Sequence, residues 1–247
     1  HLRDHEPDHF QRTTRVLVGA KDFIIFRLTG QAVTDPTTAA TTGMYNFEAG
    51  CWASEWLTTL GLSHISLPHL YEAGDCVGQV TTAAAEMTGL DHGLSVFCGL
   101  GDAAATTLGA GVTDSTQSYA YLGTSAWVAT LANTFHTGPS PLFLLPCPQA
   151  EWHIRIGPIS NAGSVHRWAV QLLGKDDEAQ GYAAMESLVS LTATDAEVLF
   201  LPYLSAERLP VSTEKPQGSF LGLSLQTTQA QMLRSVLEGV ALSLLWA

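Results

Sequence analysis

Residues 94–111, LSVFCGLGDAAATTLGAG, constrain the fold more than any other stretch of the chain. The apolar residues 94–100 predict a short strand, and the small residues after Asp102 predict a helix. Gly99 and Gly101 lie in the turn between the two and allow a ligand to approach the backbone closely. In α/β sheets, ligands bind beyond the carboxyl ends of the strands, so this turn is a candidate binding position.

Asp102 has two interpretations that the local sequence does not separate. In the first, Asp102 is a helix N-cap, which accepts backbone N–H groups and favours the positive end of the helix dipole. In the second, its carboxylate faces a binding crevice and accepts the proton of a hydroxyl group. A side chain committed to its own helix cannot also face a substrate, so the two interpretations compete.

The remaining pattern mixes helices and strands and predicts an α/β chain. Helical spacing over 7–30, with a break near Gly19 and a stop at Gly30, precedes several short elements. Residues 117–133 alternate between apolar and polar side chains on either side of a Gly-Thr-Ser turn, which predicts a hairpin. This change of pattern suggests a domain boundary at about 111–115.

Composition narrows the classes of partner. The chain has 247 residues, 46% of them hydrophobic and 14% charged, which is enough apolar material for two domains or parts of two. A formal net charge of −12 without a Lys/Arg cluster argues against nucleic acid and anionic membranes as partners. No apolar run approaches the ~20 residues of a membrane span, and the polar start is unlike a signal peptide, so we expect a cytoplasmic protein.

Other chemistries have little support. The four cysteines form no CxxC pair, and we assign no metal site to them or to the histidines. Neither a GxSxG elbow nor a GxxxxGK[ST] loop is present, which disfavours the corresponding hydrolases and P-loop enzymes. The LGTS turn at 122–125 is either an ordinary hairpin turn or a concavity of N–H and hydroxyl groups that binds phosphate.

Residues 218–238, GSFLGLSLQTTQAQMLRSVLE, resemble the C-terminal signature of the FGGY family of carbohydrate kinases. The residues at the restricted positions of that signature are Gly218, Phe220, Gly222, Leu223, Gln231, Met232, Ser235, Val236, Leu237 and Glu238. A match at so many fixed positions is far more specific than a lone glycine motif.

Further blocks of the chain resemble the same family in the same order. They are KDFIIFRLTG with VTDPTTAATTGMYNF, GLGDAAATTLGAG, LGTSAWV and LPYLSAERLP, the last with Ala206 where the family has Gly. Within the family, GDAAAT and GTSAWV look closer to xylulokinase-like members than to glycerol kinases. The resemblance extends over nearly the whole chain.

The resemblance implies the actin-like ATPase, or ribonuclease H-like, two-domain fold, present here in part. Residues 1–111 would form the C-terminal part of the N-terminal domain, and residues 112–247 the N-terminal part of the C-terminal domain. Sugar would lie between the domains and ATP in the cleft, with Mg²⁺ carried by the nucleotide. Asp102 matches the family's catalytic base, and Gly123, Thr124 and Ser125 match its phosphate turn.

Secondary site residues follow from the same resemblance. Ala103 and Asp35 join Asp102 as candidate substrate-binding residues, although an Asp before Pro is also a common turn residue. Asn161 and Gly163 are candidate nucleotide-binding residues, with a simple turn before the next helix as the alternative. The pair Glu207-Arg208 is expected to be an ion pair or a loop anchor without a catalytic role.

The implied activity is ATP-dependent phosphorylation of a sugar hydroxyl, with D-xylulose converted to D-xylulose 5-phosphate. The family's D-x-G-T-type phosphate motif and its Gly-Gly-Gly-Ala-like adenosine motif are not in the sequence, so we expect an internal segment that is inactive alone. The alternatives are a kinase for another pentulose, polyol or sugar acid, and a non-catalytic sugar-binding or assembly protein. The sequence does not give the oligomeric state, and a homodimer stays open.

Overall fold

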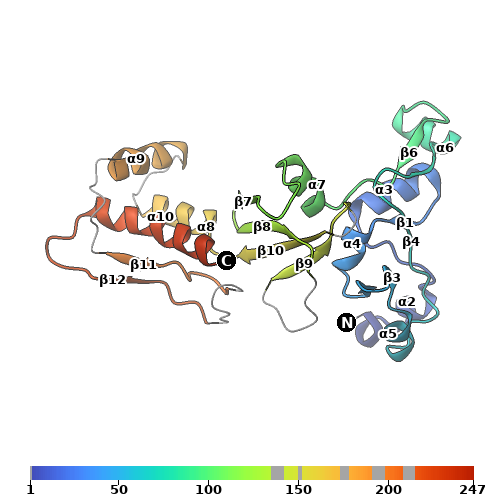
Figure 1. Ribbon diagram of the computed structural model, residues 1–247, viewed down its shortest axis with the longest axis horizontal. Coiled ribbons are helices and arrows are strands. Elements are labelled where there is room, and N and C mark those ends of the chain that lie inside the picture. The colour runs from blue at the N-terminus through green and yellow to red at the C-terminus, as the bar shows by residue number, and fades with distance from the viewer. Residues whose placement is uncertain (1, 135–141, 150–151, 173–177, 191–197, 208–214) are drawn as a thin grey trace. The chain divides into compact units, whose positions relative to one another are not determined.

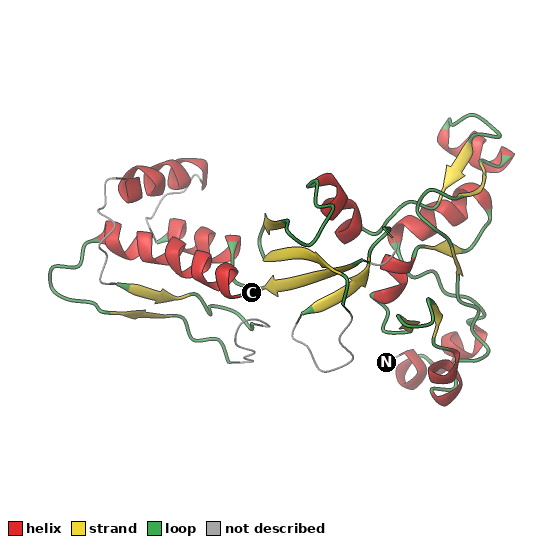
Figure 2. Ribbon diagram, in the orientation of Figure 1, coloured by secondary structure: helices red, strands yellow, loops and turns green. Residues whose placement is uncertain are grey.

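The computed structural model describes residues 2–134, 142–149, 152–172, 178–190, 198–207 and 215–247, and within them the chain forms two compact units (Figure 1). Each unit combines helices with short strands, as Figure 2 shows. None of the helices in these ranges is long and apolar enough to cross a membrane.

The first unit contains short helices and paired strands. Its elements are α1 (Leu2–His5), α2 (Pro7–Arg12), α3 (Ala20–Thr29), β1 (Val33–Thr34), α4 (Pro36–Ala40), β2 (Tyr45–Asn46), β3 (Cys51–Trp52), α5 (Ser54–Thr59), β4 (His69–Leu70), β5 (Cys76–Gln79), α6 (Thr82–Thr88), β6 (Ser95–Phe97) and α7 (Asp102–Gly109). Strands β1 and β4 pair in parallel, whereas β2 with β3 and β5 with β6 are antiparallel pairs.

The helix expected over 7–30 is two helices. Between α2 and α3, Arg15 forms a parallel bridge with Ser66, and the Val16 N–H donates to the Ser66 carbonyl, so this segment is extended. Gly19 then caps α3 in an extended conformation, and Gly30 ends it with φ 77°. The predicted break and stop are confirmed, but the helix resumes only after the extended segment.

The strand expected at 94–100 is shorter and more exposed than its apolar sequence suggests. Among the described residues, strand β6 pairs only with β5, in a two-stranded antiparallel sheet, and Phe97 is 56% exposed. Gly99, with φ 69°, follows the strand. The α/β interpretation placed the candidate turn at Asp102 after a strand of a parallel sheet. The strand before this turn instead belongs to an antiparallel pair.

The second unit begins after Thr113. The elements after Thr113 are β7 (Ser118–Leu122), β8 (Ala126–Ala132), β9 (Phe143–Pro146), β10 (His153–Ile159), α8 (Gly163–Gln171), α9 (Glu178–Ser190), β11 (Leu199–Leu201), β12 (Ser219–Leu221) and α10 (Gln229–Trp246). Strands β7 and β8 form the predicted hairpin, with Leu122 opposite Ala126, in a sheet of order β7-β8-β10-β9.

The compact units do not divide the chain at a single point. The end of β8, most of β9 and the start of β10 group with the first unit, although they follow Thr113 in sequence. A linear division into residues 1–111 and 112–247 stays a prediction for the domains.

The core of the second unit lies where α10 packs on β11 and meets α8 and α9 (Figure 1). Phe200 of β11 is 2% exposed, stacks on Trp168 at 5.7 Å between ring centroids, and contacts Phe220 at 4.6 Å. Helix α10 begins with a capping box, in which Thr228 and Gln231 each bond the backbone of the other. The packing assigns Trp168 to the core.

Gly239→Ala should destabilise the second unit. A Cβ at Gly239 would collide with the carbonyl oxygen of Phe200, so α10 could no longer approach β11 as closely. Overpacking costs typically about 1–3 kcal/mol, which exceeds the roughly 1 kcal/mol that Ala contributes to helix propensity over Gly. Gly109→Ala in α7 is the control, because a Cβ at Gly109 would meet open space, and it should be neutral or stabilising. Urea unfolding of the two variants checks the prediction. Equal stability of the two variants would contradict the prediction.

Candidate active site

Asp102 is the first residue of α7, and Gly101 occupies the N-cap position before it, with φ −61° and ψ 153°. The Asp102 side chain is exposed, and its Oδ1 accepts the Ala103 N–H at 2.8 Å. Within the described ranges, Oδ2 of Asp102 makes no hydrogen bond. The N-cap interpretation of Asp102 is therefore wrong, and the carboxylate keeps one oxygen open toward solvent.

Helix α7 buries one face through small residues. Ala104 and Thr107 are both fully buried, and the Thr107 hydroxyl bonds the Ala103 carbonyl at 2.8 Å. Ala103 itself is half-buried. One face of the helix is therefore packed while its first residue, Asp102, remains accessible.

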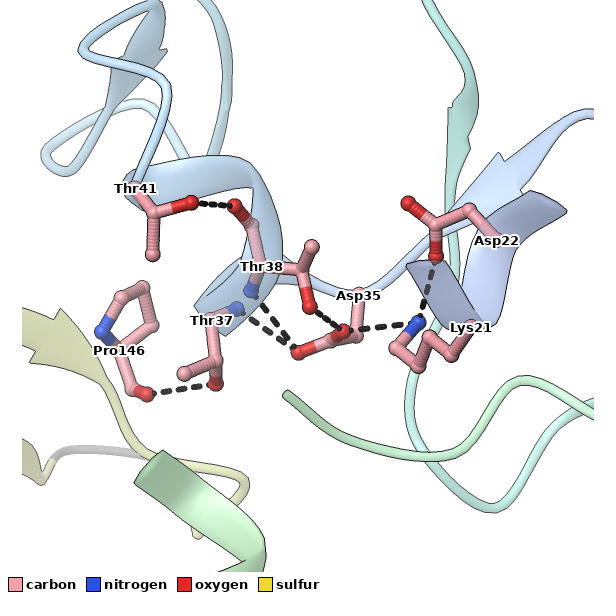
Figure 3. Close-up of polar contacts among 7 residues, drawn as sticks. All are labelled: Lys21, Asp22, Asp35, Thr37, Thr38, Thr41 and Pro146. Atoms are coloured by element: carbon pink, nitrogen blue, oxygen red, sulfur yellow. Dashed lines mark hydrogen bonds and ion pairs between the residues drawn. The ribbon is translucent and has the colours of Figure 1, made fainter. Parts of the chain in front are cut away.

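Asp35 caps the neighbouring helix α4. Its Oδ2 accepts the N–H groups of Thr37 and Thr38 at 3.0 and 3.2 Å, and its Oδ1 accepts the Thr38 hydroxyl at 2.5 Å (Figure 3). The Thr37 hydroxyl in turn bonds the Pro146 carbonyl at 2.9 Å. Asp35 is fully buried, so the geometry favours the turn alternative, and direct contact with a sugar stays a prediction.

Lys21 joins two buried carboxylates. Its Nζ lies 2.8 Å from Asp22 Oδ1 and 3.0 Å from Asp35 Oδ1, and both aspartates are fully buried (Figure 3). Burial alone would lower the pKa of Lys21, but its hydrogen bonds and charge interactions with the two aspartates raise it above the ordinary value. The sequence patterns included Lys21 and Asp22 in a family block without assigning them a role.

Acid should weaken the first unit through Asp35. Burial would raise the pKa of this carboxyl, but hydrogen bonds from Thr38 and Lys21 and the Lys21 charge hold it below its ordinary value. A lowered pKa in the folded state contributes stability above the unfolded pKa of about 3.9 and loses it as the pH falls through the folded pKa. Below about pH 4, the unfolding free energy should therefore fall more steeply in the wild type than in Asp35→Asn. The unfolding free energies of the two proteins are measured by urea titration from pH 6 to pH 3. An equal dependence on pH in the wild type and in Asp35→Asn would contradict this prediction.

The turn Gly123–Ser125 is bound to the start of α8. The N–H groups of Gly163 and Ser164 donate to the carbonyls of Gly123 and Thr124, both at 3.0 Å. A Cβ at Gly163 would collide with the Gly123 carbonyl oxygen, so only glycine allows this contact. The structure thus brings Gly163 and the turn together. The Gly163 N–H, however, donates to the Gly123 carbonyl and is not available to a nucleotide.

Thr124 and Ser125 offer hydrogen-bond donors to an anion. Both are exposed, and in the part of the chain that the structure describes their backbone N–H groups and hydroxyls make no hydrogen bond. The Gly123 N–H instead donates to the Ser125 carbonyl at 2.9 Å. Donors of this kind in a tight turn fit phosphate oxygens, so the residues present are compatible with a nucleotide phosphate.

Asn161 has a structural partner in Glu207. Its Nδ2 donates to Glu207 Oε2 at 2.7 Å and to the Ser205 carbonyl at 3.0 Å, while its Oδ1 accepts the Ser205 N–H at 2.8 Å. Glu207 also accepts the Ser160 N–H at 2.6 Å. The predicted loop anchor is thus Glu207 on Asn161, whereas Arg208 lies outside the described residues. These bonds occupy the Asn161 side chain. A contact between Asn161 and the nucleotide stays a prediction.

The 218–238 signature has a structural explanation in this unit. A Cβ at Gly218 would lie 2.5 Å from Leu204 Cδ2, and Gly222 has φ 81°, which favours glycine. Ser235 is buried and bonds the Met232 carbonyl at 2.8 Å. The signature thus supports the packing of α10 and β12.

Residues 5–9, HEPDH, have the HExxH spacing of zinc sites, which our assignment of no metal site did not consider. That motif requires both histidines on one continuous helix, but α1 ends at His5 and α2 begins at Pro7. His9 Nδ1 pairs with Glu6 Oε2 at 2.8 Å on the surface. Across the described ranges, no group of three metal-ligating side chains could hold an ion.

The fold and the sequence place the chain in a class of sugar kinases. Residues 1–109 match the N-terminal domain of the FGGY family of carbohydrate kinases, and residues 118–246 match its C-terminal domain. The chain belongs to this family, whose fold is that of the actin-like ATPases.

The proteins that the chain resembles include xylulose kinases and a gluconate kinase. The xylulose kinase of Staphylococcus xylosus is 28% identical over 98% of this chain and 50% of its own length. Solved structures of a xylulose kinase and a gluconate kinase from Lactobacillus acidophilus superpose with TM-scores of 0.87 and 0.89, at 29% and 30% identity. The match to the xylulose kinase structure includes 98% of this chain and 49% of that protein, and the match to the gluconate kinase structure includes 100% of this chain and 50% of that protein. The chain thus spans about half the length of the relatives it matches.

Proposed function

We propose that the protein containing this chain transfers a phosphoryl group from ATP to a hydroxyl of D-xylulose, which yields D-xylulose 5-phosphate. The observation that carries the proposal is the exposed carboxylate of Asp102 at the start of α7, in a chain of a carbohydrate kinase family. The xylulose kinases among the relatives support the choice of sugar.

Asp102 acts as the general base in this proposal. The sugar oxygen forms a bond to the transferred phosphorus, the bond from that phosphorus to the leaving ADP oxygen breaks, and the hydroxyl proton passes to the Asp102 carboxylate. Phosphoryl transfer depends mostly on positioning and charge stabilisation, so the base needs only to orient the hydroxyl and accept its proton as the bond forms. The open Oδ2 of Asp102 suits this task, because Oδ1 is held by the Ala103 N–H.

Thr124 and Ser125 bind phosphate oxygens through their N–H and hydroxyl groups. ATP, with Mg²⁺ bound to it, supplies the phosphoryl group and part of the charge neutralisation. The bonds from Gly163 and Ser164 hold the turn in place so that its donors need not reorganise when phosphate binds. Glu207 and Asn161 fix the chain next to α8 and serve the site indirectly.

A sugar panel tests the proposal. ADP release and sugar phosphate formation are measured for the full-length protein that contains this chain, with D-xylulose, D-ribulose, gluconate and glycerol, and we expect the highest kcat/KM for D-xylulose. The similarity to a gluconate kinase structure makes a sugar acid the second candidate, which a preference for gluconate would establish. Calorimetric sugar binding without turnover on any sugar would instead favour a non-catalytic sugar-binding protein.

A further inference from the structure

Thr38 of α4 lies between the starts of two other helices. Its Cγ2 would be 2.8 Å from a Cβ placed on Gly19, the N-cap of α3, and its Oγ1 would be 2.9 Å from a Cβ placed on Gly101, the N-cap of α7. Both glycines therefore lie against the Thr38 side chain with no space for one of their own. Three helix N-termini meet at this threonine.

The Thr38 side chain is held in one orientation. Its hydroxyl donates to Asp35 Oδ1 at 2.5 Å, and its backbone N–H donates to Asp35 Oδ2 at 3.2 Å (Figure 3). Asp35 is fixed in turn by Lys21, whose Nζ lies 3.0 Å from Oδ1. With Oγ1 bound in this way, the hydroxyl faces Gly101 and the methyl group faces Gly19.

We propose that Thr38 is a positioning residue for the reaction, because it sets the place of Gly101 and through it the direction of the Asp102 carboxylate. Asp102 directly follows Gly101, and its side chain has a single hydrogen bond to hold it among the described residues. A displacement of about 1 Å at a reacting group can lower the rate about 100-fold. The inference rests on the proposed function of Asp102 as the base.

The first test compares Thr38→Val with Thr38→Ser, and like the tests below it uses the full-length protein that contains this chain. Valine keeps the shape of threonine but replaces the hydroxyl by a methyl group, which cannot bond Asp35 and presses on Gly101. We expect kcat to fall about tenfold or more in Thr38→Val, with the sugar KM changed less than about twofold. Thr38→Ser retains the hydroxyl, so its kcat should stay within about twofold of the wild type even if its stability falls.

The second test is a double-mutant cycle with Gly101→Ala and Thr38→Ala. Alanine at position 101 would meet the Thr38 hydroxyl at 2.9 Å and should lower kcat, although φ −61° suits any residue. Once Thr38 is alanine, the nearest remaining atom is its backbone nitrogen at 3.6 Å, an ordinary contact. The combined loss of kcat should therefore be smaller than the product of the two single losses. A multiplicative combination would contradict the contact.

Thr29→Val is the matched control. Thr29 bonds the Ile25 carbonyl at 2.8 Å, and its Cγ2 would lie 3.2 Å from a Cβ on Gly78, but it is at the opposite end of α3. This variant should lose stability and keep kcat within about twofold of the wild type. Similar losses of kcat in Thr29→Val and Thr38→Val, or unchanged kcat in Thr38→Val, would overturn the inference.

Hydrogen exchange separates this inference from the proposed function. In Thr38→Val, but not in Thr38→Ser or Thr29→Val, the amides of the first turn of α7 should exchange faster, whether or not a sugar is phosphorylated. Unchanged exchange there would overturn the positioning role. Suppose that Thr38→Val shows the faster exchange while Asp102→Asn retains full turnover. In that case Asp102 is not the base, but the contact between Thr38 and Gly101 is still supported.

Discussion

Asp102→Asn is expected to lower kcat by about 10²- to 10⁴-fold, the typical contribution of a general base. An amide cannot accept the hydroxyl proton, but its oxygen can still accept the Ala103 N–H, so the local structure should persist. The sugar KM should therefore change little compared with kcat. Because Asp102 is exposed, the unfolding free energy should stay within about 0.5 kcal/mol of the wild type.

Steady-state ADP release by the full-length protein that contains this chain measures this effect, at saturating ATP and with D-xylulose varied. Asp91→Asn is the matched control, because Asp91 is also an exposed aspartate of the first unit but lies in the loop before β6. Its kcat should equal that of the wild type. If Asp102→Asn retains more than about a tenth of the wild-type kcat, the role of Asp102 as general base is untenable.

Lys21→Met is expected to destabilise the first unit by about 3–5 kcal/mol, the usual result of removing one partner from a buried ion pair. Two fully buried carboxylates would lose their shared cation. Asp35 would keep its bonds from Thr37 and Thr38, whereas Asp22 has no other hydrogen-bond partner among the described residues. The loss should therefore come mainly from Asp22.

Urea unfolding checks this expectation with two further variants. Lys21→Met combined with Asp22→Leu should recover much of the loss, because replacing both members of a buried pair by apolar groups is often nearly neutral. Arg3→Met removes an exposed ion pair with Asp4, 3.6 Å long, and should cost less than about 1 kcal/mol. A loss in Lys21→Met no larger than that in Arg3→Met would show that the buried carboxylates do not depend on Lys21.

Local signals predicted the elements that local forces determine. Gly30 ends α3 with a positive φ, and the Gly-Thr-Ser turn joins β7 to β8, as their residue types indicate. A break near Gly19 was predicted, but the extended segment between α2 and α3 was not, because it pairs with Ser66, far away in sequence. Strand β6 follows an apolar pattern, yet among the described strands it belongs to a sheet of two strands, β5 and β6.

The contacts that link the buried polar networks across the chain could not be predicted either, because they join residues far apart in sequence. Asp35 was a candidate for substrate contact because of its motif; its capping bonds in α4 are local, but only the fold shows that it faces Lys21. Asn161 likewise stood in a candidate nucleotide position, while its partner Glu207 comes from a later loop. Hydrogen bonds between distant segments leave no spacing in the sequence by which to recognise them.

The sequence by itself determined the family, because the order of its motifs and the positions within 218–238 are properties of the chain alone. The local sequence left Asp102 undecided between a cap and a base, and the order of the family's motifs along the chain favoured the base. The tertiary structure decided against the cap, because Gly101 takes that position and packs against Thr38 of α4. Capping depends on the backbone angles of one residue, and in the folded chain Gly101, which lies against Thr38, adopts them.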